Sequence, residues 1–496
     1  MLARKVFASS AFLTGSRFLG RGLDILAALV MARFLSPADF GVVTLGLAAL
    51  MVLESFTELP VEDALLREKE LRREDVNTAY TLSVLRGLCV GALLCAAAVP
   101  LAMIYDDDRL ILLICLLGIA PVARGLRSPM MVRFARDVNY RPAATIDAVC
   151  RITSFLLAVT CAWYTESYLS LVLLSVTPQI IEMIATHVIA PYRPHFTLAK
   201  MRFILSFAGQ VTISRVLATL SSEGDRFIVG GFVSKAALGF FSMGRSVATT
   251  ASWSIAMPLL AVMYPGLAQI RHDPERFRRS YLRGQAMIVF AILPISLAMA
   301  VLADPLVRLA LGEEWLPVVP VMQAISVLNG TATFSMSAHS LVMATGQIRQ
   351  MIWRELVTLI VSIPAVTFGA MYYGLVGAVV GRVLASLVHT GMSLQMVSRL
   401  ADLPVLTQLT NPWRSILSSA VFAAVLYLVA DAMPGSNWIE LVVQLGVAGI
   451  AGAVSYVAVH LALWKLAGLP EDSPEHFLID LMQSGLRRFG TASAQS

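Results

Sequence analysis

Charged residues are scarce in this chain. Asp, Glu, Lys and Arg make up 14% of its 496 residues, whereas soluble domains carry about 25%. Hydrophobic residues reach 57%, and apolar runs of about 20 residues, long enough to cross a hydrocarbon core of about 30 Å, recur from Val6 to Lys465. The composition therefore excludes a water-soluble domain before about residue 466 and predicts a polytopic membrane protein.

Cysteine and catalytic motifs are also sparse. All five cysteines fall in apolar segments, and none forms a C-x-x-C pair: Cys89, Cys95, Cys115, Cys150 and Cys161. We interpret them as small buried hydrophobic residues, so neither disulfides nor a metal site is expected. The chain has no G-x-S-x-G, H-E-x-x-H or phosphate-loop motif, and we predict neither an enzyme activity nor a cofactor.

Turn signals divide the apolar sequence into about fourteen predicted helices. They are expected at 6–33, 41–60, 79–104, 109–132, 142–163, 168–190, 201–230, 238–268, 284–311, 317–345, 352–373, 375–398, 413–432 and 438–465. The first is predicted to be retained, because its apolar region continues past two arginines without a clear cleavage site of a signal peptide. The predicted fold class is therefore an all-α integral membrane protein.

Arg and Lys concentrate in alternate connections between these helices. Connections such as 61–77, 124–141 and 271–283 carry many of them, whereas the opposite side carries Arg33, Arg109, Lys235 and Arg308. Cytoplasmic loops retain positive charge, so both termini are predicted to be cytoplasmic. The net charge of +6 arises from these loops, and nucleic acid is not an expected partner. Amphipathic segments at 272–283 and 474–489 are candidates for contact with membrane lipids.

Eight arginines fall inside the predicted helices: Arg17, Arg21, Arg86, Arg151, Arg215, Arg226, Arg245 and Arg382. A charge at the membrane centre costs about 2.5–3.5 kcal/mol on insertion scales, so these side chains must face protein or water. A single arginine could be a packed or snorkelling structural charge. Eight of them favour a polar internal cavity.

The sequence matches itself at an offset of 198 residues. "TGSRFL" (14–19) falls on "TISRVL" (212–217), so that Arg17 corresponds to Arg215, and in the same register Gly41 corresponds to Gly239. An offset of about six helices predicts a parallel repeat about an axis along the membrane normal. We therefore expect six-helix lobes at 1–195 and 196–400, an additional helix pair at 401–465 and a cytoplasmic tail at 466–496.

Four segments resemble a known family, the Wzx-type polysaccharide transporters of the multidrug/oligosaccharidyl-lipid/polysaccharide (MOP) superfamily. They are "ARFLSPADFGVVTLGLA" (32–48), "DRFIVGGFVSKAALGFFSMG" (225–244), "YPGLAQIRHDPERFRRSYLR" (264–283) and "LALGEEWLPVVPVMQAIS" (309–326). The resemblance covers about 1–465. It departs at "ESFTELPVEDALL" (54–66), where the family more often has an Asp-Leu-Gly turn.

This resemblance implies a MATE/MOP-like fold and a specific transport activity. The expected cargo is an undecaprenyl-diphosphate-linked oligosaccharide, moved across the bacterial inner membrane by alternating access for exopolysaccharide, capsule or O-antigen synthesis. A polysaccharide polymerase and export machinery are expected partners. Related branches flip the peptidoglycan precursor or export cationic drugs. Of the other classes, a membrane glycan polymerase or ligase needs a large outer loop, and the outer connections here are short.

The spacing of charged residues within the predicted helices indicates candidate binding residues. Arg17, Arg21 and Asp24 are spaced by four and three residues, so they share one helix face. Arginine suits bidentate recognition of diphosphate or acidic sugars, whereas the alternative is an internal pair of Asp24 with Arg21. Arg215 and Arg226 also share a face, and the alternative for Arg226 and its neighbour Asp225 is an ordinary boundary charge.

Further candidates are carboxylates and isolated arginines within the spans. Glu54 and Glu58 lie one turn apart, and Asp147 with Arg151 has ion-pair spacing. Carboxylates in a low-dielectric cavity can carry H⁺ or bind Na⁺, and either ion is a candidate for coupling to transport. The alternative is an internal ion pair for Asp147 with Arg151, and a gate or loop contact for Glu58. Arg86 and Arg245 are candidates for the cationic cavity; Arg382 is a candidate for packing or for a lipid headgroup.

Overall fold

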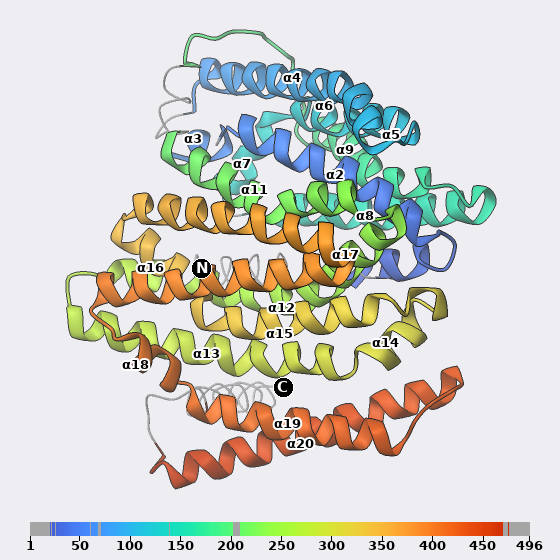
Figure 1. Ribbon diagram of the computed structural model, residues 1–496. Coiled ribbons are helices and arrows are strands. Elements are labelled where there is room, and N and C mark those ends of the chain that lie inside the picture. Colours follow the sequence, from blue (N-terminus) through green and yellow to red (C-terminus); the bar gives the residue numbers. More distant parts are fainter. Residues whose placement is uncertain are drawn as a thin grey trace, which may run out of the picture. The chain divides into compact units, whose positions relative to one another are not determined.

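The computed structural model describes residues 20, 22–24, 26–59, 61–67, 71–137, 139–201, 209–469 and 475 (Figure 1). All regular elements within these residues are α- or 3-10 helices, which confirms the predicted all-α class. Nine described helices are long and apolar enough to span a membrane. A tenth span arises if the pair Arg109–Gly125 and Pro129–Arg136, bent by 52°, counts as one. The protein is multi-pass, and the count of fourteen stays a prediction.

Two compact units divide the chain. Unit 1 comprises Met1–Met243 and Glu355–Arg382, and unit 2 comprises Gly244–Arg354 and Val383–Ser496. The chain therefore passes from one unit to the other three times. The lobes at 1–195 and 196–400, with the pair at 401–465, stay a prediction based on the repeat. The tail at 466–496 lies outside the described residues, apart from 466–469 and Glu475.

The first unit contains most of the charged residues singled out above. Its elements are α2 (Pro37–Thr57), α3 (Val61–Arg67), α4 (Arg73–Tyr105), α5 (Arg109–Leu117), α6 (Ile119–Gly125), η1 (Pro129–Met131), α7 (Val132–Arg136), α8 (Arg141–Thr165), α9 (Leu169–Ile189), α11 (Gly209–Phe232) and parts of α12 (Lys235–Gln269) and α17 (Ile348–Ala401). The break predicted between the helices at 352–373 and 375–398 is confirmed inside α17, where Gly374 has a φ of 58° and interrupts the helix.

Local sequence signals explain where helix α2 begins and ends. The Ser36 hydroxyl accepts a hydrogen bond from the Asp39 N–H at 3.3 Å, and the Asp39 carboxylate accepts one from the Ser36 N–H at 3.2 Å. This reciprocal cap satisfies amide groups that a helix start leaves unpaired. The last helical residue is Thr57; Glu58 is extended, and Leu59 precedes a proline, which disfavours helical backbone. Glu54 and Glu58 thus lie in and just after the last turn.

Glycines bring α4 and α6 into close contact (Figure 1). A Cβ added at Gly87 would lie 2.4 Å from the Pro121 carbonyl oxygen, and one at Gly125 would lie 2.4 Å from the Ser83 carbonyl oxygen. Gly87 and Gly91 form a G-x-x-x-G pattern, which permits such an approach of two membrane helices. Because each contact glycine is adjacent to an arginine, this packing places Arg86 and Arg124 near the same crossing.

A second close contact joins the starts of α2 and α12. A Cβ added at Gly41 would lie 2.0 Å from the Lys235 carbonyl oxygen, and one at Gly239 would lie 1.9 Å from the Pro37 carbonyl oxygen. Gly41 with Gly239, and Pro37 with Lys235, are the pairs that the 198-residue offset relates. The two contacts are therefore reciprocal: each helix start places a glycine against the backbone of the other.

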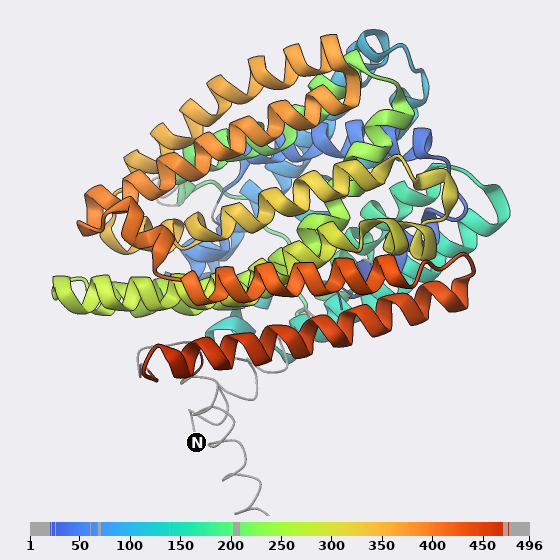
Figure 2. The same ribbon diagram turned by 60° about the horizontal axis from the view of Figure 1, so that its bottom comes forward.

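Unit 2 is built from helix pairs of its own. It contains the rest of α12 and α17, with α13 (Pro274–Val301), α14 (Ala303–Ala310), η2 (Glu313–Trp315), α15 (Val318–Met336), α16 (Ala338–Thr345), α18 (Val405–Thr410), α19 (Trp413–Ala432) and α20 (Trp438–Leu466). Helices α19 and α20 lie side by side, in orange-red in Figure 2. Their buried Phe422 and Tyr456 pack with Leu302 of the unit, and the Tyr456 hydroxyl donates to the Phe290 carbonyl at 2.8 Å.

Candidate functional site

A cavity of about 430 Å³ lies in unit 1 between α2 and α11, with α4 and α6 at its side. It is lined by Met51, Glu54, Ser55, Glu58, Arg86, Arg124, Arg215, Thr219, Ser222 and Glu223. We call it the α2–α11 cavity. The lining residues of α2 follow i, i+3, i+4, i+7 spacing, and those of α11 follow i, i+4, i+7, i+8 spacing, so each helix presents one face.

A second cavity of about 360 Å³ lies beside the first, along α4 and α6, and we call it the α4–α6 cavity. The two cavities share five lining residues, all charged: Glu54, Glu58, Arg86, Arg124 and Arg215. The α4–α6 cavity adds polar groups such as Tyr80, Ser128 and Arg127 to an otherwise largely apolar wall. The shared charges therefore form the junction of the two cavities.

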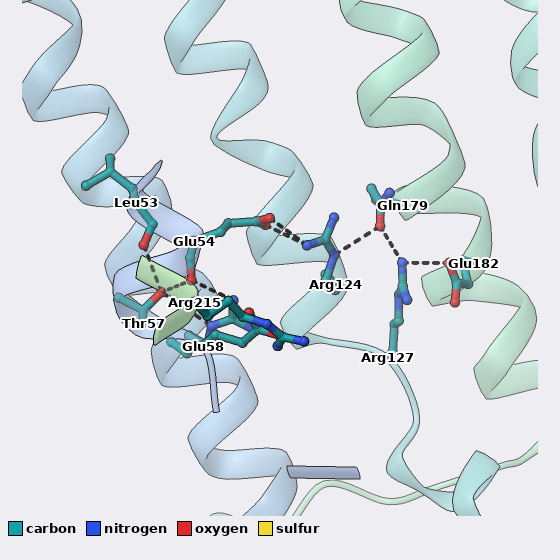
Figure 3. A network of polar contacts seen from close by, with 10 residues as sticks. Leu53, Glu54, Thr57, Glu58, Arg124, Arg127, Gln179, Glu182 and Arg215 are labelled. Carbon is teal, nitrogen blue, oxygen red and sulfur yellow. Dashed lines mark hydrogen bonds and ion pairs between the residues drawn. The ribbon is translucent and has the colours of Figure 1, made fainter. Parts of the chain in front are cut away.

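Ion pairs connect α2 to its neighbours at this junction (Figure 3). Nη1 of Arg124 lies 2.7 and 2.8 Å from the two carboxylate oxygens of Glu54. Arg215 of α11 pairs with Glu58. The side chain of Arg215 is 56% exposed and that of Glu58 is 36% exposed, so this pair is open to a ligand in the cavity.

Arg86 reaches the same place from α4. Its Nη2 donates to the backbone carbonyl of Glu54 at 3.2 Å, and its Nε donates to Oγ1 of Thr57 at 3.4 Å. These carbonyl and hydroxyl groups belong to the last turn of α2, where backbone oxygens lack partners within the helix. Arg86 thus fixes the end of α2 to α4 and lines both cavities.

The network continues from α6 to α9. Nε of Arg124 donates to Oε1 of Gln179 at 3.4 Å, and Arg127 contacts both Gln179 and the Glu182 carboxylate, the latter at 2.6 Å (Figure 3). Sequence reasoning missed these four residues, because it assigned Arg124 and Arg127 to a cytoplasmic connection and singled out neither Gln179 nor Glu182. The available signal was the G-x-x-x-G pattern beside Arg86, which predicts a close helix partner for α4.

Two predicted cavity residues, Arg17 and Arg21, lie outside the described residues. The third member of that helix face, Asp24, pairs with Nη1 of Arg151 on α8 at 2.7 Å. Nε of Arg151 also lies 3.0 Å from Asp147, four residues earlier, so the expected ion pair within this helix is present. Asp24, Asp147 and Arg151 are absent from the lining of both cavities.

Two of the remaining arginines, Arg226 and Arg382, make ion pairs within the helix packing of unit 1. Arg226 pairs with Glu223 one turn earlier, and Asp225 lies 3.4 Å from Nε of Arg382, whose Nη1 donates to the Ser221 carbonyl. The Asp225 side chain is only 1% exposed and that of Arg226 15%, so neither is a solvated boundary charge. Arg226 is not a lining residue of either cavity. Arg245 lies on α12 in unit 2 and is not a lining residue either.

Comparison with known proteins decides the family. Residues 30–320 match the family described as polysaccharide biosynthesis protein, and this span is more than half of the chain. The chain belongs to this polysaccharide biosynthesis family. The four segments that resemble Wzx-type transporters are thus explained by common membership, and the predicted family is confirmed.

Relatives of this family member are identical to it at about a fifth of the aligned positions. The chain is 21% identical to the succinoglycan biosynthesis transport protein ExoT of Rhizobium meliloti, over 95% of this chain and 94% of that protein. It is 20% identical to the lipopolysaccharide biosynthesis protein WzxC of Escherichia coli, over 75% and 76%. A membrane protein of the cps region of Klebsiella pneumoniae is 21% identical over 75% and 78%.

Solved structures show that this family member has the fold of the MOP superfamily. The lipid II flippase MurJ in an inward closed conformation superposes with a TM-score of 0.69 at 14% identity, over 91% of this chain and 98% of that one. A MATE multidrug transporter of the superfamily, inward-facing, gives 0.58 at 14% identity, over 77% and 96%. The family member is therefore a multi-pass polysaccharide biosynthesis protein with the fold of MOP flippases.

Proposed function

We propose that this protein is a flippase for undecaprenyl-diphosphate-linked oligosaccharides, carried from the cytoplasmic to the outer leaflet of a bacterial inner membrane. The observation that carries the proposal is the α2–α11 cavity, which gathers charged groups and hydroxyls among apolar helices. A sugar diphosphate needs such groups on its path, because hydrocarbon offers no hydrogen bonds. The names of relatives in polysaccharide biosynthesis support the same cargo class.

The charges of the cavity distinguish this proposal from drug export. Three arginines and three glutamates line its described part, so the arginine-rich cavity expected from the sequence is offset by carboxylates. A cavity selected for cationic drugs would carry an excess of acidic groups. Balanced charges instead suit a polar, largely uncharged glycan with one anionic end. Arg17 remains a proposed cavity residue on the basis of its correspondence to Arg215.

The proposed mechanism is alternating access with both termini cytoplasmic. The reciprocal contact of Gly41 with Gly239 supports a two-fold relation between the repeats, which such transporters use to open on alternate sides. The lobes at 1–195 and 196–400 would then move against each other. We keep H⁺ and Na⁺ as candidate coupling ions, with Glu54 and Glu58 as the candidate carboxylates from the sequence that line the cavity.

Deletion of the gene in its native host tests this function. We expect loss of a surface polysaccharide, with lipid-linked repeat units accumulating on the cytoplasmic side of the inner membrane, and restoration by the wild-type gene. The sidedness is measured with a membrane-impermeant enzyme that cleaves the lipid-linked glycan. Normal polysaccharide export without the gene contradicts the proposal. Accumulation of the peptidoglycan precursor instead would assign the protein to that branch of the superfamily.

A further inference from the structure

Arg86 differs from the other arginines around the two cavities in the partners that it has. Arg124, Arg127, Arg215 and Arg226 each pair with a carboxylate, respectively Glu54, Glu182, Glu58 and Glu223. Among the residues that the structure describes, Arg86 makes hydrogen bonds only to neutral oxygens, the Glu54 carbonyl and the Thr57 hydroxyl. Within the described part of the chain, these five arginines meet four carboxylates, and Arg86 is the one without a carboxylate partner.

The surroundings of Arg86 leave that charge in place. Electrostatic interactions reach it from Glu54 and Glu58, which attract, and from Arg124 and Arg215, which repel. The attraction by the two glutamates is the larger, but each of these four groups already has a partner of its own. The guanidinium of Arg86 is therefore a net positive centre at the junction of the two cavities.

The geometry also holds Arg86 ready for a ligand. It lies 13 residues after Arg73, about 20 Å along the 33-residue helix α4, within one turn of its midpoint. Two of its five N–H donors are used by the end of α2, which fixes the plane of the guanidinium. The contact of neighbouring Gly87 with α6 fixes the backbone. Three donors remain for another acceptor.

We infer that Arg86 binds the anionic group of the transported molecule, a phosphate or diphosphate, at the junction of the α2–α11 and α4–α6 cavities. This inference rests on the proposed function and specifies where the anionic end of the cargo lies. Guanidinium matches phosphate oxygens in a bidentate geometry. A phosphate that approached Arg124 or Arg215 would first have to displace a glutamate, whereas at Arg86 it completes a missing ion pair.

Binding of inorganic pyrophosphate to the purified full-length protein tests the inference. The variants are Arg86→Gln, Arg86→Lys and, as a matched control, Arg151→Gln, which removes an intramembrane arginine that lines neither cavity. We expect Arg86→Gln to weaken binding at least about tenfold, Arg86→Lys to weaken it less, and Arg151→Gln to stay within about twofold of wild type. Equal binding by wild type and Arg86→Gln, or no binding by wild type, overturns the inference.

A second variant keeps the arginine and removes only its free charge. Ser83 lies three residues before Arg86 on α4 and also lines the α4–α6 cavity, so Ser83→Asp places a carboxylate one turn away. We expect this variant to lose pyrophosphate affinity as Arg86→Gln does, while the neutral Ser83→Asn loses clearly less affinity than Ser83→Asp. Unchanged binding by Ser83→Asp contradicts the inference. Size-exclusion profiles identify any variant that fails to fold.

Export in the deletion strain separates this inference from the proposed function. If the wild-type gene restores polysaccharide export and Arg86→Gln restores it equally, the flippase assignment stands and the role of Arg86 is refuted. If deletion has no effect on export, the flippase assignment fails, and pyrophosphate binding alone then decides whether Arg86 is an anion site. Restoration by wild type together with failure of Arg86→Gln supports both.

Discussion

The crossing of α2 and α12 gives a stability prediction that can be worked from its geometry. Alanine at Gly41 or Gly239 would place a Cβ 2.0 or 1.9 Å from a backbone oxygen, whereas ordinary contacts begin at 3.4 Å. The helices must therefore separate by about 1.4 Å, because a carbonyl in a helix has no rotamer to adopt. Overpacking of this kind costs about 1–3 kcal/mol. Gly41→Ala and Gly239→Ala should cost similar amounts, since the contacts are reciprocal.

The double variant makes this prediction sharper. Once the helices have moved apart for one Cβ, the other meets a wider gap, so Gly41→Ala with Gly239→Ala should cost clearly less than the sum of the single variants. SDS titration of the purified protein measures the three free energies of unfolding. Gly446→Ala is the control, because a Cβ there meets nothing within 4 Å. Strict additivity, or single variants as stable as the control, would refute the reciprocal crossing.

Three further predictions follow from other contacts. Asp225→Ala leaves the Arg382 guanidinium buried without its carboxylate and should destabilise the protein by about 3–5 kcal/mol, while Asp225→Leu with Arg382→Met should recover most of that loss in the same SDS titration. Gly87→Val should force α4 away from α6 and release the Arg86 contacts with α2, which would show as lower thermal stability in detergent than that of Gly266→Val, where a Cβ meets nothing within 4 Å. Burial acts to raise the pKa of Asp107 in the loop before α5, but hydrogen bonds and the charge of Arg109 outweigh it and hold this pKa below its ordinary value of 3.8. The stability that this pair adds is therefore present at neutral pH and is lost as the pH falls below that value. Melting temperatures of Asp107→Asn, measured across this acidic range, should lack that loss.

Local sequence patterns predicted the parts of the protein that depend on local physics. Runs of apolar residues and turn residues defined membrane helices, and the spacing of Asp147 and Arg151 predicted an ion pair that the structure contains. The predicted helix at 41–60 contains both Glu54 and Glu58, whereas the observed helix ends at Thr57, one residue before Glu58. These features need only the period of an α-helix, which the sequence displays directly.

Long-range pairs lay beyond that reasoning. Asp225 and Arg382 are 157 positions apart, and no local pattern connects them. Arg124 was assigned to a connection because charge and a helix end coincide there; α6 ends at Gly125, and the chain then bends by 52°. For this reason the sequence did not predict that Arg124 pairs with Glu54. Charge type and helix register were predictable, whereas the choice of partner depends on tertiary packing.

The pairing of Asp225 with Arg382 has a consequence for how the chain is made. At synthesis rates of about 5–20 residues per second, the 157 residues between them take roughly 8–30 s to emerge. During that interval the nascent α11 has no Arg382 to compensate its buried carboxylate. We therefore expect α11 to stay at the membrane interface or in the insertion machinery until Arg382 emerges. Biogenesis, and not only transport, therefore constrains the residue at position 225.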